Sequence, residues 1–62
     1  MRIDRIKLVA EITRQDITQK QLAERSGVSR TTINYIKGGK SCSEEVGEKI
    51  AKGLGLSIDQ LM

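Results

Sequence analysis

A run of polar side chains at the start of one predicted helix has the chemistry to recognise the edges of bases. Arginine can pair with guanine through two hydrogen bonds, asparagine can pair with adenine, and a threonine methyl can contact thymine. The segment SRTTINYIKGGK, which starts at Ser29, carries such groups on one expected face in Arg30, Thr31, Asn34, Tyr35 and Lys37. This pattern predicts double-stranded DNA as the partner.

A second set of polar groups suits the phosphate backbone of DNA. Glutamine, threonine and lysine side chains bind phosphates, as do free backbone N–H groups. Such contacts fix the position of a protein on DNA without reading the sequence of bases. The complete set of candidate DNA-binding residues is Gln19, Ser29, Arg30, Thr31, Thr32, Asn34, Tyr35, Lys37, Gly39 and Lys40.

The helix that carries these groups needs a second helix to brace it. Thr18 followed by Gln21 is a capping box, which predicts that the bracing helix begins there. Gly27 can take the left-handed backbone conformation that ends a helix, and Ser29 is the expected cap of the next one. The sequence therefore predicts a helix-turn-helix over residues 18–38.

Small and apolar residues stand where such a hairpin requires them. Ala23 is small enough for the crossing of the two helices, and Val28 is an apolar plug for the turn. Ile33 and Ile36 lie three residues apart and form the expected inward face of the second helix.

A further helix is predicted before the hairpin, from about Asp4 to Gln15. Its apolar residues recur at spacings of three and four. The expected inward stripe is Ile3, Ile6, Val9, Ala10 and Thr13, broadened by Leu8 and Ile12.

Two more helices are predicted after the hairpin. Ser41 or Ser43 is the expected cap of the fourth helix, and Ser57 that of a last short one. Gly47 and Gly53 lie inside the fourth helix; the first suits a close helix crossing, and nothing in the sequence explains the second. The expected fold is all-α, a compact five-helix bundle forming a single domain over residues 1–62.

The charge is distributed unevenly along the chain. Residues 1–40 hold nine basic and four acidic side chains, whereas residues 41–62 hold two basic and four acidic ones. The basic excess thus coincides with the hairpin, which suits a polyanion. A net charge of +3 is equally compatible with ordinary solvated surface.

The composition argues against several other classes of protein. The chain has no histidine and a single cysteine, Cys42, so we expect no zinc site, no cofactor, no disulfide and no enzymatic activity. No apolar run approaches the roughly 20 residues of a membrane span, and the N-terminus lacks the apolar core of a signal peptide. A cytoplasmic protein is expected.

Two segments resemble one known family. The pattern QxxLAxxxGVSxxTIxxIxxGK, from Gln19 to Lys40, and the pattern KIAKxLGLSxxxL, from Lys49 to Leu61, are similar to the lambda-repressor-like Cro/CI (XRE) helix-turn-helix family. The resemblance covers about residues 8–61, and the two segments are separated by the same number of residues as in the family. It implies a five-helix DNA-binding domain.

The resemblance also implies roles for individual residues. Gln19 would contact a phosphate at the start of the bracing helix, and the backbone-contacting loop would hold Gly39 and Lys40. The implied base-reading positions are Arg30, Thr31 and Tyr35.

Two departures from the family pattern matter. Many members have, in place of Lys37, a glutamate that pairs with an arginine of the first helix, but here Ile12 stands near that position. We therefore expect no such ion pair and a Lys37 that faces phosphate. Glu44 and Glu45 replace basic residues that reach the minor groove in some members, so no reading of the minor groove is expected.

The favoured hypothesis is a phage or bacterial transcriptional repressor that binds an operator as a homodimer. Ile58, Leu61 and Met62 are candidate dimer contacts, with closure of the bundle an equal alternative. A second hypothesis is a protein-interaction module, such as an antitoxin or a phage anti-regulator, that uses an acidic surface at Glu44, Glu45 and Glu48. No small-molecule ligand is evident.

Overall fold

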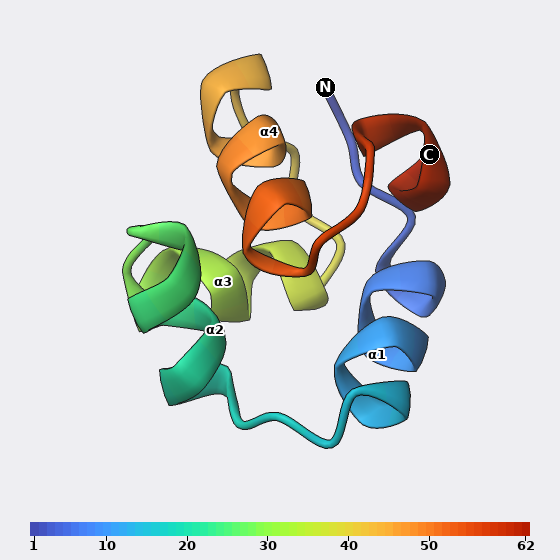
Figure 1. Cartoon of the computed structure of the whole chain (residues 1–62). Coiled ribbons are helices and arrows are strands. Elements are labelled where there is room, and N and C mark those ends of the chain that lie inside the picture. The colour runs from blue at the N-terminus through green and yellow to red at the C-terminus, as the bar shows by residue number, and fades with distance from the viewer.

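Four α-helices joined by short connections, and one closing turn, make up the chain (Figure 1). The computed structural model describes all of residues 1–62. The elements are α1 (Arg5–Arg14), α2 (Gln19–Ser26), α3 (Arg30–Lys37), α4 (Glu44–Gly53) and a 3-10 turn, η1 (Ile58–Leu61). The all-α prediction is confirmed, and no helix is long and apolar enough to cross a membrane.

The expected fifth α-helix is instead a single 3-10 turn. Its hydrogen bonds span three residues, from Gln60 N to Ser57 O and from Met62 N to Asp59 O. Only four residues belong to η1, which is too few to establish a regular ladder of four-residue hydrogen bonds. The bundle therefore has four α-helices closed by η1.

The predicted capping box at the start of α2 is confirmed. Thr18 Oγ1 accepts a hydrogen bond from Gln21 N at 3.0 Å, and Gln21 Oε1 accepts one from Thr18 N at 2.8 Å. At the other end of α2, Gly27 has a φ of 74° and donates its N–H to Ala23 O. This left-handed residue reverses the chain between α2 and α3, as the sequence predicted.

The remaining α-helices also begin at side-chain caps. Asp4 accepts hydrogen bonds from the N–H groups of Ile6 and Lys7 at the start of α1. Of the two serines expected to cap α4, Ser43 does so, by accepting from Val46 N at 3.2 Å. These caps satisfy backbone donors that the helices leave free.

The core is aliphatic and receives residues from every element. Its ten buried side chains are Ile3, Leu8, Leu22, Val28, Ile33, Ile36, Ile50, Ala51, Leu54 and Leu61. The helix α2 packs against both α3 and α4, and α1 packs against α3 and η1. This arrangement leaves one side of α3 uncovered.

The expected inward stripe of α1 is only partly correct. Ile3, Leu8 and Ile12 lie on the core side as expected. The remaining members are exposed: Ile6, Val9, Ala10 and Thr13. Ile6 is 66% exposed and Val9 41% exposed, whereas Leu8 is fully buried and Ile12 half-buried. The helix has two apolar faces, since Leu8 and Ile12 form one stripe while Ile6 and Val9 form another about a quarter-turn or more away. Packing against α3 and η1 buries the face of Leu8.

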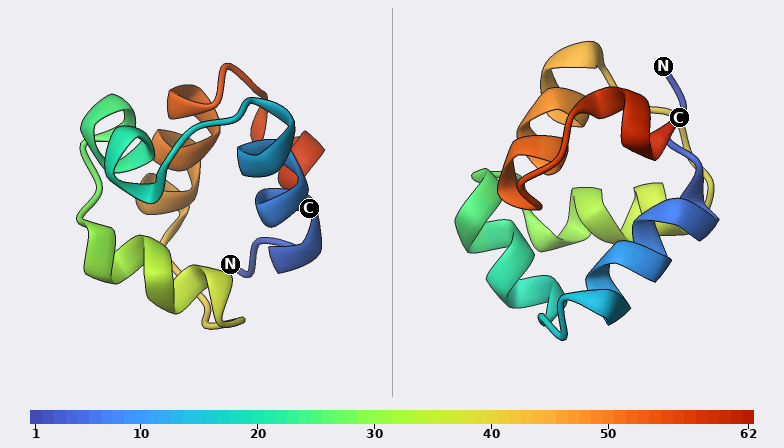
Figure 2. Two further views of the ribbon diagram at one scale, coloured as in Figure 1. Left: turned by 90° about the horizontal axis from the view of Figure 1, so that it is seen from below. Right: turned by 45° about the vertical axis from the view of Figure 1, so that its right-hand side comes forward.

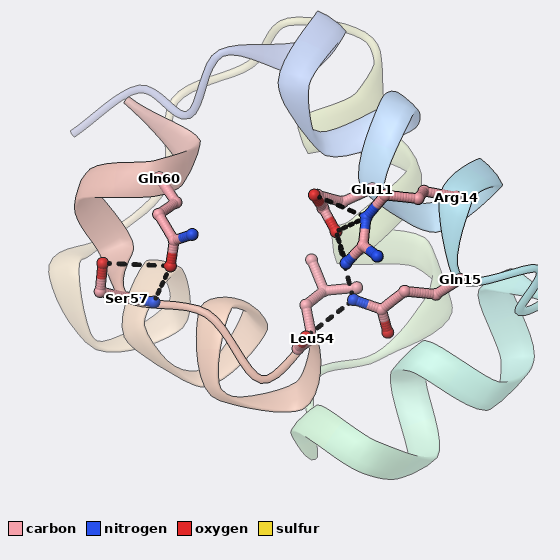
Figure 3. Close-up of polar contacts among 6 residues, drawn as sticks. All are labelled: Glu11, Arg14, Gln15, Leu54, Ser57 and Gln60. Carbon is pink, nitrogen blue, oxygen red and sulfur yellow. Dashed lines mark hydrogen bonds and ion pairs between the residues drawn. The ribbon is translucent and has the colours of Figure 1, made fainter.

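Hydrogen bonds fasten the two ends of α1 to distant parts of the chain. Gln15 Nε2, at the C-terminal end, donates to Leu54 O at 2.8 Å, where α4 ends (Figure 3). Arg14 donates to Glu11 beside it, and these hydrogen bonds lower the pKa of the Glu11 carboxyl. Ahead of the helix, Asp4 N donates to Leu61 O at 2.8 Å.

The two glycines inside α4 serve different purposes. A Cβ at Gly53 would lie 3.0–3.1 Å from Cβ, Cα and N of Ser26, so the missing side chain lets α4 approach the backbone of α2. A Cβ at Gly47 would lie 2.5 Å from Met1 Sδ and 3.3 Å from Ile58 Cδ1. Gly47 therefore accommodates the N-terminal side chain rather than a crossing α-helix, and Gly53 makes the close helix approach.

Alanine at these two glycines should have opposite effects on stability. Alanine is favoured over glycine inside a helix by roughly 1 kcal/mol. At Gly53 the added methyl meets backbone, and overpacking of this kind costs roughly 1–3 kcal/mol. We expect Gly53→Ala to lower the free energy of unfolding by about 1 kcal/mol after both effects.

Gly47→Ala is the matched control, because the flexible Met1 side chain can move away from the new methyl group. Its free energy of unfolding should be unchanged or up to about 1 kcal/mol higher. Urea denaturation followed by circular dichroism measures both variants. A Gly53→Ala protein at least as stable as Gly47→Ala would contradict the packing described here.

Candidate nucleic-acid interface

The uncovered side of α3 carries the polar residues that the sequence singled out. Ile33 and Ile36 are buried on the inner side of this helix. Arg30, Thr31 and Asn34 are exposed on the outer side, and Tyr35 is 55% exposed. In the left view of Figure 2, α3 runs along the lower edge of the molecule with the other helices above it. The helix can therefore be approached from outside by a partner.

Gln19 connects the start of α2 to both ends of α3. Its Nε2 donates to Arg30 O at 3.1 Å, and its Oε1 accepts from Lys37 Nζ at 3.1 Å. The side-chain amide thus links the backbone of the first residue of α3 to the side chain of its last residue. This bridge joins the start of α2 to α3.

The bridge alters the expected roles of Gln19 and Lys37. Both side chains are half-buried and already hydrogen-bonded within the protein. A lysine ammonium has three protons, so Lys37 keeps two that can reach a phosphate. Gln19 has fewer hydrogen-bonding groups left for a phosphate, because its amide nitrogen and oxygen are both engaged within the protein. Its position indicates that it orients α2 relative to α3.

Ser29 and Thr32 form the cap of α3. Ser29 Oγ accepts from Thr32 N at 3.1 Å and donates to Thr32 Oγ1 at 2.9 Å. Thr32, one of the candidate DNA-binding residues, is half-buried. The N–H groups of Arg30 and Thr31 have no acceptor within the protein and remain free at the end of the helix where anions are favoured.

The loop after α3 has no free N–H at Gly39 or Lys40. Gly39 N donates to Ile36 O at 2.9 Å, and Lys40 N donates to Tyr35 O at 3.1 Å. Phosphate binding through these two backbone groups, one of the routes expected from the sequence, is therefore closed. The Lys40 side chain remains exposed, with Nζ 5.4 Å from the centroid of the Tyr35 ring.

Two arginines outside the predicted set lie near this loop. Arg2 and Arg5 are both exposed, and they line an open notch with Ile3, Asp4, Gly39 and Met62. The charge count showed a basic excess in residues 1–40 but not where on the folded surface these basic residues lie. No local pattern could show that the start of α1 meets the loop after α3, because the two are far apart in the sequence.

The candidate dimer contacts are not equivalent. Leu61 is fully buried in the core, so its side chain closes the bundle and is not available to a second chain. Ile58 is half-buried, while Met62 is 49% exposed. Only Ile58 and Met62 keep surface that a partner can contact.

Two short helices joined by a tight turn, with a polar outer face on the second, define a DNA-binding helix-turn-helix domain. Comparison with protein families agrees, since the helix-turn-helix family model matches residues 6–61. The chain belongs to this family, of the Cro/CI (XRE) type, as its sequence resemblance indicated. A search of the curated proteins and a search of the solved structures gave no match.

Proposed function

We propose that the chain is a phage or bacterial transcriptional repressor that reads an operator in the major groove with α3. The observation that carries this proposal is the two-sided character of α3, with Ile33 and Ile36 buried and a polar outer face free. A helix held in this way can enter the major groove of B-DNA with its N-terminal residues against the base edges. Such a role places the protein in the cytoplasm, on the nucleoid.

The outer face of α3 divides into base-reading and backbone-binding groups. Arg30 and Thr31 stand in the first turn and are assigned to base edges, with Tyr35 one turn further along. Lys37 and Lys40, toward the other end of the helix, are assigned to phosphates. The free N–H groups of the first turn add donors for a phosphate that lies at the end of the helix.

Operator binding as a homodimer is part of the proposal. A single module of this size buries roughly 600–1,000 Å² on DNA, which gives weak binding alone. Two copies on half-sites about one helical turn apart would bind more tightly. Ile58 and Met62 are the proposed contacts between the copies.

Selection of bound sequences from a random pool of duplexes tests the proposal. We expect a recurring site with two related halves separated by about one turn of DNA. Titration of that site at several salt concentrations should show log K falling against log[salt] with a slope of several units. This slope measures how many phosphates the protein neutralises.

A flat salt response and no recurring site would contradict DNA binding. If the protein also co-purified with another protein, the result would favour the interaction module instead. The exposed Glu44, Glu45 and Glu48 on α4 are the surface assigned to that alternative.

A further inference from the structure

We infer that the DNA-binding surface extends beyond the hairpin to the start of α1, where Arg5 binds a phosphodiester of the DNA backbone. Arg2 lines the same notch and adds a second positive charge beside Arg5. The inference rests on the proposed function, because it assigns a second element to the same DNA partner. Neither arginine belongs to the helix-turn-helix.

The stem of Arg5 lies against the loop that follows α3. Arg5 Cδ is 3.6 Å, and Nε 4.0 Å, from the position that a Cβ would take at Gly39. Gly39 has a φ of 96°, in the left-handed region that suits glycine. Both views of Figure 2 show the end of α3 close to the N-terminal segment and the start of α1. The packing holds the guanidinium beside the proposed interface.

The guanidinium of Arg5 has no acceptor in the protein. The ion pairs of the chain are Arg14 with Glu11 and Lys49 with Glu45, so neither Arg5 nor Arg2 belongs to one. Asp4 is the acidic residue of the notch. Its Oδ1 already accepts the N–H groups of Ile6 and Lys7, at the positive end of the helix dipole. An arginine that is exposed, packed along its stem and unpaired at its head can bind an anion.

A continuous basic edge links this arginine to the reading helix. Lys40 follows Gly39 in the loop and places Nζ over the ring of Tyr35. This edge runs from Tyr35 past Lys40 to Arg5. Neither Lys40 nor Arg5 belongs to an ion pair, so both positive charges are free. The planar fork of an arginine matches the oxygens of a phosphate, and a phosphodiester is the anion that DNA repeats along such an edge.

The ordinary alternative is a solvated surface arginine that only adds to the net charge. The two interpretations differ in what happens when the charge is removed locally. If Arg5 binds a phosphate, its loss should remove one released counterion from the binding equilibrium. If it adds only net charge, the loss of any exposed basic residue should have the same effect.

The test measures the salt dependence of binding to a duplex of random sequence for Arg5→Met, Arg5→Lys and Lys52→Met. Arg5→Met keeps an apolar stem on Gly39 and removes the charge, whereas Arg5→Lys keeps the charge. Lys52→Met removes one exposed charge from α4. Arg5→Gln serves as a second neutral variant if circular dichroism shows that Arg5→Met is not folded.

For Arg5→Met we expect the slope of log K against log[salt] to become shallower by about 0.9 for each bound copy of the chain. For each bound copy, the loss of affinity between 50 and 200 mM salt would then be roughly 3.5-fold smaller than for the unchanged protein. Arg5→Lys and Lys52→Met should keep the original slope. Affinity should fall equally on all DNA sequences, as for a phosphate contact.

Two results would overturn the inference while leaving the proposed function intact. One is a steep slope that Arg5→Met does not change; the other is an equal change in Arg5→Met and Lys52→Met. An unchanged protein without salt-dependent DNA binding would overturn both proposals together. The slope of the unchanged protein therefore separates the two failures.

Discussion

Leu22→Ala should lower the free energy of unfolding of the domain by roughly 2–5 kcal/mol. Leu22 is fully buried on α2, the helix that packs against both α3 and α4, and its loss would leave a cavity in the core. The free energy of unfolding of a small domain lies near the lower end of the usual range of about 5–15 kcal/mol. Urea denaturation monitored by circular dichroism measures the change.

Ile6→Ala is the control for this prediction. Ile6 is also a large aliphatic residue on a helix, but it is 66% exposed. Its replacement should change the free energy of unfolding by no more than about 0.5 kcal/mol. Equal destabilisation by the two substitutions would show that α1 packs with the face containing Ile6, contrary to the structure.

Arg30→Ala should weaken binding to the selected operator by about 1–3 kcal/mol, which corresponds to roughly 5–150-fold. Arg30 is exposed in the first turn of α3, where its guanidinium can pair with the O6 and N7 atoms of a guanine. Repeating the selection with the variant should relax the preference at one base pair of each half-site. The measurement is the affinity for the operator and for its single-base variants.

Arg30→Lys separates two roles of this arginine. A lysine keeps the charge but not the planar fork, so a base-reading arginine should lose much of its discrimination in this variant as well. If Arg30→Ala weakens binding to every DNA sequence equally, and Arg30→Lys restores it, the residue contacts phosphate. That outcome would contradict base reading by Arg30.

The helix boundaries could be predicted because their signals are local. Three signals act on backbone groups within four residues of themselves: the capping box of Thr18 and Gln21, the left-handed Gly27, and the cap Ser29. All three behave as expected. Capping hydrogen bonds of this kind depend on residues that are close in sequence. The helix-turn-helix could therefore be predicted from the sequence.

The orientation of α1 could not be predicted from periodicity. This helix has two apolar stripes, and the sequence favoured the one that contains Ile6 and Val9. Which stripe is buried depends on the docking of α1 against α3 and η1, a property of the whole bundle. The role of Gly53 was hidden for the same reason, because Ser26 meets it only after α2 and α4 have packed.

The exposed outer face of α3 was predictable from the sequence, whereas the hydrogen bonds around this helix were not. Solvent exposure of Arg30, Thr31 and Tyr35 follows from the helix period once Ile33 and Ile36 face the core. By contrast, the hydrogen bonds of Gln19 and the internal use of the N–H groups of the loop depend on distances between elements. The spacing of residues along the sequence does not predict those distances.

The chain contains a single tyrosine and neither tryptophan nor phenylalanine. That tyrosine, Tyr35, stands on the outer face of α3 beside Lys40. All of the aromatic fluorescence of the protein therefore originates at the surface assigned to DNA, and none comes from the core. Association with a duplex can be followed through this one residue without attaching a label, and the signal needs no correction for aromatic residues elsewhere in the chain.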